Sequence, residues 1–424
     1  MAGGTGSDAR SSCVSSGNPK VAPSWHQGGV CQTWRVRVLT IANHVGARGG
    51  LERTQLTMCK SLAGRGHQVD LMFVTAGDFI EEWCSFAHTM TEFVGSLPKS
   101  SSPLSSSIEF LRAVNRTRQI HPDVIYIFRP LDIPFAVAVG KLSGAPVVLH
   151  LCLPQPKRLP SLVRHALPQV ATTVAVSHDT ANLWRDSGLR TDRTIVVHTG
   201  IDMDYYVPAS SDEISATRTS LGIDPDALVV LYAGRISRVK GVELLVRAFH
   251  KVVVEQPDAR LVVVGGASLG AGPGDGEDYA DELRRLSVPL DVMWLDARKN
   301  VLPLIQMADV AVAPSVWAEP FSRSVIEPLA CGVPVIASRV GGNPEIATGW
   351  LDEYLVPPGD VDALAERIRS LCGWRSSDPG LGERCRASVV ERLSLHREVD
   401  AVEAALVSAA GSGASATGGP AKGV

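Results

Sequence analysis

The chain has 424 residues, of which 45% are hydrophobic and 20% charged, and its formal net charge at pH 7 is −3. This length accommodates two domains that each bury a core. The near-neutral charge argues against a protein whose overall field attracts nucleic acid or an anionic membrane. The eight cysteines are scattered without a CxxC pair, so the sequence indicates neither a zinc site nor a disulfide framework.

The two ends of the chain, residues 1–34 and 409–424, are rich in small residues and are expected to be disordered tails. The start lacks the apolar core of a signal peptide. No apolar run reaches the roughly 18–20 residues that a membrane span requires. We therefore expect a cytoplasmic protein, with peripheral contact to the inner face of the membrane as an open alternative.

Short apolar runs alternate with helical patterns along the first half, which is typical of a parallel α/β sheet. The first strand is predicted at Val36–Ala42. A helix follows from about Leu51, and Gly64 and Gly66 are expected to end it. Further strands are predicted at residues 69–74, 122–128, 146–150, 173–177 and 195–198. Residues 76–106 hold little recognisable pattern.

A second α/β series begins near Ala227, after a connection over residues 203–226. Its strands are predicted at residues 228–232, 260–264, 291–295, 310–313 and 333–337, with helices between them such as 242–254 and 362–371. The sequence therefore predicts an α/β protein of two Rossmann-like, doubly wound parallel-sheet domains, at residues 35–205 and 206–408.

A basic loop follows the first strand of the second half and runs from Arg235 to Lys240, ahead of a helix that starts near Gly241. The free N–H groups of a helix N-terminus favour phosphate, and arginine and lysine add charge and hydrogen-bond donors. The loop indicates a phosphate site, with a solvated turn before a helix as the plain alternative.

Two glutamates lie eight residues apart in the segment that follows a later buried strand. Glu319 is expected in a loop and Glu327 in the second turn of a helix from about Phe321 to Cys331. Eight helical residues rotate by about 800°, which is about 80° away from the same face, so the carboxylates do not form an acid/base dyad. Glu327 could bind a ribose diol and Glu319 a sugar. For either residue alone, the alternative is an acid that the helix dipole stabilises.

Three further features lie next to predicted strands. Gly49 and Gly50 form a glycine-rich loop at the start of a helix. His150 ends a strand at the carboxyl edge of the sheet, where ligands bind in open α/β folds. Gly341 and Gly342 would let the backbone approach a ligand closely. A strand-end histidine can equally be structural, and the glycine pair can equally form a tight turn.

Two weaker signals have plain alternatives. Asp202 and Asp204 spell a DxD metal motif, but they lie in the linking region and are interpreted as coincidental. A basic segment surrounds three apolar residues and is either an amphipathic helix that contacts lipid headgroups or an ordinary surface helix. It comprises Lys157, Arg158, Arg164 and His165 around Leu159, Leu162 and Val163.

Taken together, the segments resemble the family-4 glycosyltransferases of the GT-B fold. The resemblance runs in family order across roughly residues 36–375, and the ordered set is specific. It rests on GGLER, SLAGRGHQVDLMF, VAVSHDT, HTGIDMDYYVP, YAGRISRVKG, the E-x7-E signature EPFSRSVIE, and IEPLACGVPVIASRVGGNPEI. The chain departs from the family where HTGID lacks the usual asparagine, and where Asp296 replaces a glycine, which puts the base contacts in doubt.

The resemblance implies two domains facing across a cleft, an N-terminal acceptor domain and a C-terminal nucleotide-sugar domain. Arg235 and Lys240 would hold the donor diphosphate, and Glu327 would bind ribose. The donor sugar would be held by Glu319 with the main chain of Pro320, Phe321 and Ser322. Gly49 and Gly50 would approach the phosphates from the opposite domain, and His150 would lie by the sugar.

The resemblance also implies a retaining transfer of a sugar from a nucleotide-diphosphate donor, in which UDP is the commonest nucleotide. The acceptor would be a hydroxyl group of a compound in glycolipid, polysaccharide or natural-product biosynthesis. No metal or other cofactor is expected, because the cationic side chains would stabilise the leaving diphosphate. No nucleic-acid partner is expected. The alternatives are a GT-B sugar-nucleotide epimerase or phosphorylase, and a non-catalytic sugar-nucleotide-binding subunit.

Overall fold

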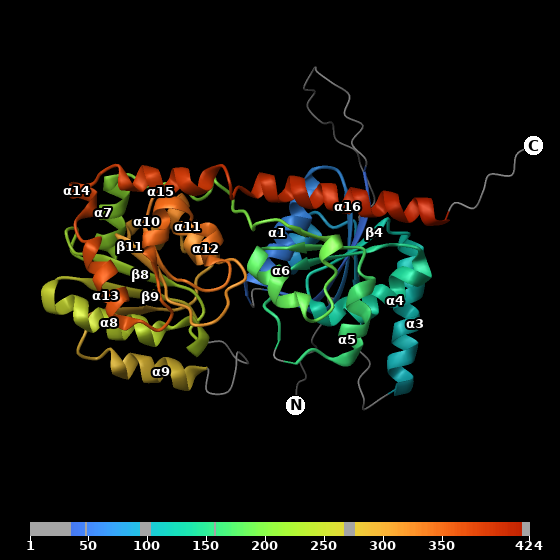
Figure 1. Ribbon diagram of the computed structural model, residues 1–424, viewed down its shortest axis with the longest axis horizontal. Helices are drawn as coiled ribbons and strands as arrows, with labels where there is room; N and C mark the ends of the chain where they lie inside the picture. The colour runs from blue at the N-terminus through green and yellow to red at the C-terminus, as the bar shows by residue number, and fades with distance from the viewer. Residues whose placement is uncertain (1–34, 47–48, 94–102, 157, 267–275, 418–424) are drawn as a thin grey trace, which may run out of the picture.

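The computed structural model describes residues 35–46, 49–93, 103–156, 158–266 and 276–417. These residues form two α/β domains that lie side by side (Figure 1). Each domain is built on one sheet whose strands pair in parallel. The predicted fold class is confirmed.

The N-terminal sheet has the strand order β3-β2-β1-β4-β5-β6-β7. Its strands are β1 (Arg37–Val45), β2 (Gln68–Ala76), β3 (Thr89–Glu92), β4 (Val124–Ile127), β5 (Val147–Leu151), β6 (Thr172–Ala175) and β7 (Thr194–Val196). The predicted strands of the first half are present, and β3 is an additional edge strand in the segment where the sequence showed no pattern.

The C-terminal sheet has the strand order β10-β9-β8-β11-β12-β13. Its strands are β8 (Val229–Ala233), β9 (Arg260–Val264), β10 (Val292–Leu295), β11 (Val310–Ala313), β12 (Val335–Ser338) and β13 (Leu355–Val356). The five predicted strands of the second half are confirmed, and the two-residue β13 adds the edge.

Helices cover both faces of each sheet. In the N-terminal domain they are α1 (Gly50–Gly64), α2 (Ile80–Cys84), α3 (Pro103–Ile120), α4 (Ile133–Ser143), α5 (Ser161–Ala166) and α6 (His178–Arg185). In the C-terminal domain they are α7 (Ser211–Ser220), α8 (Val242–Glu255), α9 (Glu277–Leu286), α10 (Leu302–Met307), α11 (Arg323–Ala330), α12 (Asn343–Ile346), α13 (Val361–Ser370), α14 (Trp374–Ser377) and α15 (Leu381–Val390). The chain closes with α16 (Leu395–Thr417).

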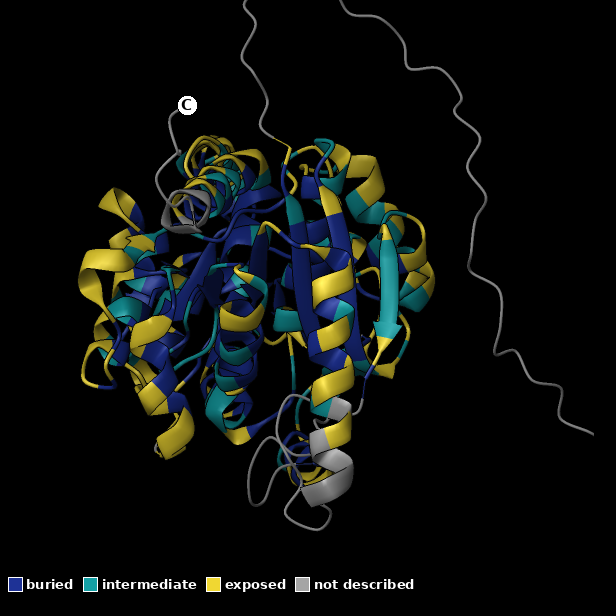
Figure 2. Cartoon of the chain, turned by 90° about the vertical axis from the view of Figure 1, so that its right-hand side faces the viewer, coloured by how far each residue is buried: buried dark blue, intermediate teal, exposed yellow. Residues whose placement is uncertain are grey.

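The central strands are apolar and buried because helices pack on both of their faces, as Figure 2 shows for the N-terminal domain. All five residues of β5 and all four of β11 are buried. Neighbouring residues of a strand face opposite layers. Leu149 accordingly packs in the layer of α3, α4 and α5, whereas Val148 packs in the layer of α1 and α16.

The two domains are joined by two crossing segments that lie next to each other. The first leads from β7 to α7, and the second leads from α15 to α16. Ile201 donates to the carbonyl of Leu393 at 3.0 Å, and Leu395 donates to the carbonyl of Ile201 at 2.8 Å. A side chain at Gly200 would clash with the Ser394 carbonyl, at 2.4 Å from its Cβ. The crossings are therefore tightly paired.

The last helix corrects the predicted domain limits. α16 contacts α1, β4, β5 and β6, so residues from Leu395 onward pack on the N-terminal domain, although the sequence assigned them to the C-terminal one (Figure 1). The helix also continues to Thr417, beyond the tail predicted from residue 409. Val399, Val402 and Leu406 are buried against the sheet, which explains why the helix packs on the N-terminal domain. The predicted tail at 1–34 and residues 418–424 lie outside the described residues.

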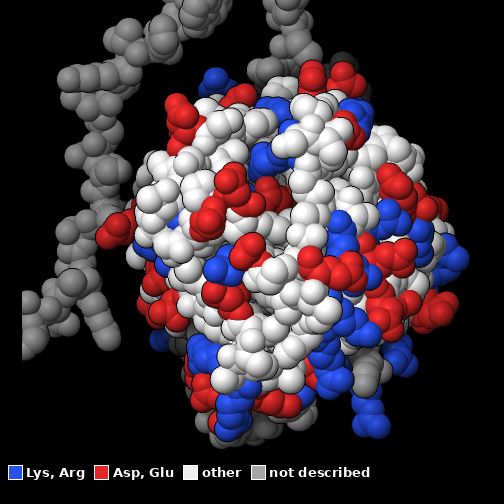
Figure 3. Space-filling view, turned by 90° about the vertical axis from the view of Figure 1, so that its left-hand side faces the viewer, with Lys and Arg blue, Asp and Glu red and all other residues white. Residues whose placement is uncertain are grey.

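Basic and acidic side chains are interspersed on the outer face of the C-terminal domain (Figure 3). Exposed charges are paired in several places, for example Lys251 with Asp362 and Arg384 with Asp378. Among the described residues, no helix combines the length and the apolar character needed to cross a bilayer.

Candidate functional site: a charged cluster beside the domain junction

Lys240 and Glu319 form an ion pair at the carboxyl edge of the C-terminal sheet. Lys240 lies in the turn after β8, and Glu319 lies in the loop between β11 and α11. The Lys240 Nζ is 2.5 Å from Glu319 Oε1, and this oxygen also accepts hydrogen bonds from Ser315 Oγ at 2.5 Å and Trp317 Nε1 at 2.7 Å. The Glu319 side chain is 7% exposed and that of Lys240 is 22% exposed, so the lysine is open to a ligand.

Glycine makes this approach of the two loops possible. Gly241 adopts φ +70, and a Cβ there would lie 2.0 Å from the carbonyl oxygen of Pro314. Val316 also donates to the carbonyl of Val239 at 2.9 Å. Because the two loops are pinned together at these points, Lys240 is held over the segment that carries Glu319.

Arg235 belongs to the same neighbourhood. The Tyr232 hydroxyl donates to the Arg235 carbonyl at 2.7 Å. Burial raises the pKa of Tyr232, the negative charge of Glu319 raises it further, and the positive charge of Arg235 opposes the rise. Both charges therefore act on one hydroxyl, so the three predicted groups Arg235, Lys240 and Glu319 share one corner of the domain.

Glu327 lies on α11 and has partners of its own. Its Oε1 accepts from Arg323 Nε at 2.9 Å, and the Tyr206 hydroxyl contacts both side chains. Burial raises the pKa of Tyr206, and the charge of Glu327 adds to the rise. Glu319 and Glu327 thus face different groups, as predicted, but the cause is that Glu319 lies in the loop before α11 and not a rotation along one helix.

The helix that carries Glu327 begins later than predicted. α11 starts at Arg323 rather than about Phe321, so Pro320, Phe321 and Ser322 remain in the loop. Ser322 is the N-cap residue, but its hydroxyl pairs with the Ser324 hydroxyl at 2.8 Å instead of capping the helix. The Ser322 carbonyl nevertheless accepts from Val325 N at 3.1 Å and from Ile326 N at 3.3 Å, so it belongs to the first turn of α11.

The glycine pair Gly341 and Gly342 packs against protein rather than opening space for a ligand. A Cβ at Gly341 would lie 2.1 Å from the Glu319 carbonyl oxygen, and one at Gly342 would lie 2.3 Å from that of Pro320. Gly342 also donates to the Glu319 carbonyl at 2.7 Å. The pair therefore packs against the backbone of the Glu319 loop and holds it in place.

Gly49 and Gly50 lie at the exposed N-terminus of α1, Gly49 as its N-cap. Among the residues that the structure describes, a Cβ at Gly50 would meet nothing within 4 Å, and one at Gly49 would meet only the Glu52 carboxylate, at 3.5 Å. Packing therefore does not require glycine here, which leaves the predicted approach to a ligand as an expectation.

His150 is not placed at a ligand surface, contrary to the expectation that it lies by the donor sugar. The residue is fully buried, its Nδ1 is 2.6 Å from the Tyr126 hydroxyl, and its Nε2 is 3.8 Å from Glu398 Oε1 of α16. Burial lowers the pKa of His150 to about 3, so the ring is neutral. The physical reason is α16, which covers the face of the sheet toward which His150 points.

The weaker signals have structural explanations. Asp202 Oδ1 accepts from the backbone N–H groups of Asp204 and Tyr205 at 3.0 and 3.1 Å, so the DxD sequence forms a turn. Within the described ranges, no group of three or more His, Cys, Asp or Glu side chains could hold a metal ion.

The basic segment does not form a lipid-facing helix. Leu159 and Val163 are buried in the core of the N-terminal domain, and only Leu162 is exposed. The apolar residues of an amphipathic membrane helix would have to face outward. Lys157 lies outside the described residues.

Several groups of the site were not predicted from the sequence. Trp317 donates to Glu319 and holds its ring 5.5 Å from the Lys240 ammonium, and Tyr206 reaches Glu327 from the first crossing segment. His198 and Glu345 pair at 3.0 Å across the domain junction. The nearness of Trp317 to Glu319 in sequence could have singled it out. His198 ends the predicted strand 195–198, just as His150 ends its strand, whereas Tyr206 carries no local signal.

Two family models match the chain in succession. Residues 48–205 match the model described as "Glycosyltransferase Family 4", and residues 213–382 match "Glycosyl transferases group 1". The boundary between the matched stretches coincides with the crossing segment between β7 and α7.

Curated relatives match part of the chain. Over 228 residues it is 30% identical to D-inositol 3-phosphate glycosyltransferase from Kribbella flavida, covering 52% of this chain and 51% of that protein. Over 248 residues it is 29% identical to N-acetyl-alpha-D-glucosaminyl L-malate synthase from Bacillus anthracis, covering 58% and 61%. The match therefore spans about half the length of these relatives.

Solved structures match the fold over both domains. HepE from Anabaena, solved in complex with UDP and glucose, superposes with a TM-score of 0.76 at 22% identity, covering 88% of this chain and 100% of that chain. A glycosyltransferase from Rickettsia africae superposes with a TM-score of 0.77 at 18% identity, covering 89% and 99%. With both domains matched in sequence and in architecture, the chain belongs to the family-4 glycosyltransferases of the GT-B fold.

Proposed function

We propose that the protein is a retaining, metal-independent glycosyltransferase that moves a sugar from a nucleotide-diphosphate donor, with UDP as the expected nucleotide, to a hydroxyl acceptor. The observation that carries this proposal is the contact of Lys240 with Glu319 beside Arg235. Two cations that can hold a diphosphate and one carboxylate that can accept from sugar hydroxyls lie near one another at the same edge of the sheet, which supports the proposal.

The ion pair leaves Lys240 able to bind phosphate. An ammonium group has three N–H donors, and one of them is directed at Glu319. The remaining donors can meet diphosphate oxygens while Glu319 keeps its place beside the sugar. Glu327, held on α11 by Arg323, would accept hydrogen bonds from the ribose.

In the proposed reaction, the bond between sugar C1 and the diphosphate oxygen breaks first, and negative charge builds up on the diphosphate. Arg235 and Lys240 stabilise this charge in place of a metal ion. The acceptor oxygen then bonds to C1 on the side that the diphosphate leaves, and a diphosphate oxygen takes the acceptor proton. This course preserves the anomeric configuration and requires no protein base, which fits a buried, neutral His150.

The acceptor is the least constrained part of the proposal. The names of two relatives refer to D-inositol 3-phosphate and to L-malate, both small hydroxylated anions. We include such compounds with lipid and oligosaccharide alcohols as candidate acceptors.

The test is to incubate the purified protein with UDP-, GDP-, dTDP- and ADP-sugars and an acceptor panel, and to identify products by mass spectrometry and NMR. A glycoside with the donor's anomeric configuration supports the proposal. An epimerised nucleotide sugar, a free sugar phosphate, or binding without turnover would each overturn it in favour of an epimerase, a phosphorylase or a binding subunit.

A further inference from the structure

Glu345 makes a direct link between the two domains. It lies on α12 of the C-terminal domain and reaches the N-terminus of α6 in the N-terminal domain. Its two carboxylate oxygens accept from the backbone N–H groups of His178, at 2.9 Å, and Asp179, at 3.0 Å. These N–H groups belong to the first turn of α6, where no helical carbonyl can satisfy them and where the helix dipole favours an anion.

The same carboxylate is connected to the loop that is proposed to hold the sugar. Glu345 Oε2 lies 3.0 Å from His198 Nε2 in the first crossing segment. The His198 ring stacks on Phe321, with centroids 4.8 Å apart and an interplanar angle of 14°. Phe321 is two residues from Glu319. Glu345 is therefore connected to the Glu319 loop through His198 and Phe321.

Close packing surrounds this link on both sides. A Cβ at Gly342 would lie 3.1 Å from the Cβ of Ser177, the N-cap residue of α6. Arg392, at the second crossing segment, donates to the carbonyl of Ile346 at 2.8 Å. α12 is therefore held by α6 and by both crossing segments, and it lies directly behind the loop of Glu319.

A second carboxylate, that of Asp179, lies in this link beside Glu345. Although burial acts to raise the pKa of Glu345, hydrogen bonds from His198 and from the α6 backbone lower it, so this carboxylate stays charged. Burial and the charge of Glu345 raise the pKa of Asp179, whose Oδ2 has no hydrogen-bond partner among the described residues. The two carboxylates therefore repel each other within the link.

We propose that Glu345 is a positioning residue whose carboxylate latches the N-terminus of α6 to the loop of Glu319 and Phe321, so that the sugar contacts are set when the domains are joined. The effect on catalysis rests on the proposed function. The latch itself is a property of the contact between the domains and can be measured without turnover.

The first test is amide hydrogen exchange on Glu345→Gln, with Glu366→Gln as the matched control because Glu366 is exposed on α13. Glutamine keeps the shape but offers one acceptor oxygen instead of two. Loss of one such hydrogen bond should speed exchange of the His178 or the Asp179 amide, whichever loses its acceptor, by about tenfold, and the control should match wild type. Unchanged exchange at these amides would overturn the latch.

The second test separates positioning from a merely structural contact. In Glu345→Gln, kcat should fall by about tenfold, whereas the Kd for UDP should stay within about twofold, because Arg235 and Lys240, the side chains proposed to hold the diphosphate, lie in the C-terminal domain and do not contact Glu345. A second variant, His198→Phe, keeps a ring against Phe321 and removes the donor, and it should lower kcat by a smaller factor. An unchanged kcat in both variants would overturn the proposal.

The two proposals fail in different ways. If wild type transfers no sugar from any donor, the proposed function fails. The latch is then tested by the amide exchange alone. If wild type is active but both variants keep full kcat, the latch proposal fails and the proposed function stands.

Discussion

Two ion pairs of the C-terminal domain invite comparison, Arg218 with Asp309 and Lys240 with Glu319. Both join a cation to a carboxylate between segments far apart in sequence, at 2.9 and 2.5 Å. They differ in whether all the polar atoms of the cation have hydrogen-bond partners within the protein.

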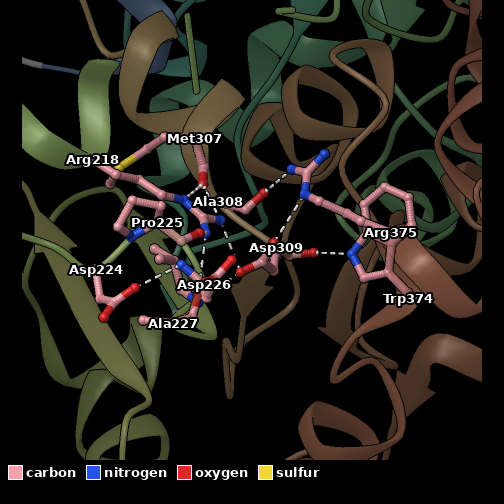
Figure 4. A network of polar contacts seen from close by, with 11 residues as sticks. Arg218, Asp224, Pro225, Asp226, Ala227, Met307, Ala308, Asp309, Trp374 and Arg375 are labelled. Atoms are coloured by element: carbon pink, nitrogen blue, oxygen red, sulfur yellow. Dashed lines mark hydrogen bonds and ion pairs between the residues drawn. The ribbon is translucent and has the colours of Figure 1, made fainter. Parts of the chain in front are cut away.

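The Arg218 pair is fully satisfied by protein (Figure 4). Its five N–H donors reach the carbonyls of Pro225, Ala227 and Met307 and the carboxylate of Asp309. Asp309 in turn accepts from Val229 N and from Arg375 Nε. With 4% of its side chain exposed, Arg218 ties α7 to the sheet and has nothing left to offer a ligand.

The Lys240 pair is more open, because the Lys240 side chain is 22% exposed and Glu319 is its partner within the described residues. An ion pair that protein groups saturate is structural, and one that retains donors beside a surface is suited to a ligand. The donors that Lys240 retains, and not its charge alone, distinguish the proposed site from the structural ion pair of Arg218. The predictions below test it, from the largest expected effect to the smallest.

Arg218→Ala should lower the free energy of unfolding by about 3–5 kcal/mol, because it removes the guanidinium donors of three carbonyls and leaves Asp309 with Arg375 as its remaining cationic partner. Urea denaturation measures this effect. Arg247→Ala, at an exposed pair with Glu243 on α8, is the control and should change the free energy by less than about 1 kcal/mol. Similar losses in the two variants would show that the Arg218 network is not structural.

Lys240→Ala should lower kcat/KM for transfer by roughly 100- to 1,000-fold, equivalent to about 2.7–4 kcal/mol, because a charge that stabilises the leaving diphosphate is lost. Stability should fall less than in Arg218→Ala, because Ser315 and Trp317 still donate to Glu319. The control is Lys251→Ala, an exposed lysine on α8, which should keep full activity. Retention of more than half of the wild-type activity in Lys240→Ala would contradict the proposed role.

Glu398→Gln should change how stability depends on pH. Burial raises the pKa of Glu398 from 4.5 to about 7, so its contribution to stability is present below the unfolded value and is lost as the pH rises through 7. Wild type should therefore lose up to about 3 kcal/mol relative to the variant between pH 5 and pH 8. Glutamine can still accept the hydrogen bond from Gly200 N. Parallel pH profiles in urea denaturation would rule out this burial effect.

Treatment with EDTA should have the smallest effect and leave the transfer rate within about twofold of its starting value, since cationic side chains are proposed to replace the metal. Initial rates before and after chelation provide the measurement. A loss of activity that added Mg²⁺ restores would contradict the cationic clamp.

The sequence predicted the repeated α/β pattern because buried strands such as β5 and β11 are continuous apolar runs. It missed β3, since Thr-Met-Thr-Glu at a sheet edge alternates too weakly to stand out. It also missed the end of α16, where a glycine- and serine-rich sequence reads as a tail. The helix is anchored ahead of that stretch by Val402 and Leu406, which pack on a surface that only the folded N-terminal domain provides.

The charged groups of the site could be predicted because Arg235, Lys240 and Glu319 follow strands of one sheet and so meet at one edge. The role of His150 could not, since its burial depends on a helix more than 240 residues later in the chain. Glu345 gave no signal as a link either, because its partners at residues 178, 179 and 198 belong to the other half of the sequence.

The most direct measurement is calorimetric titration of wild-type protein, in EDTA, with each nucleoside diphosphate and its monophosphate. If Arg235 and Lys240 hold a diphosphate, one diphosphate should bind at least about tenfold more tightly than the corresponding monophosphate. Equal affinities for the two, or no binding of any diphosphate, would contradict the account.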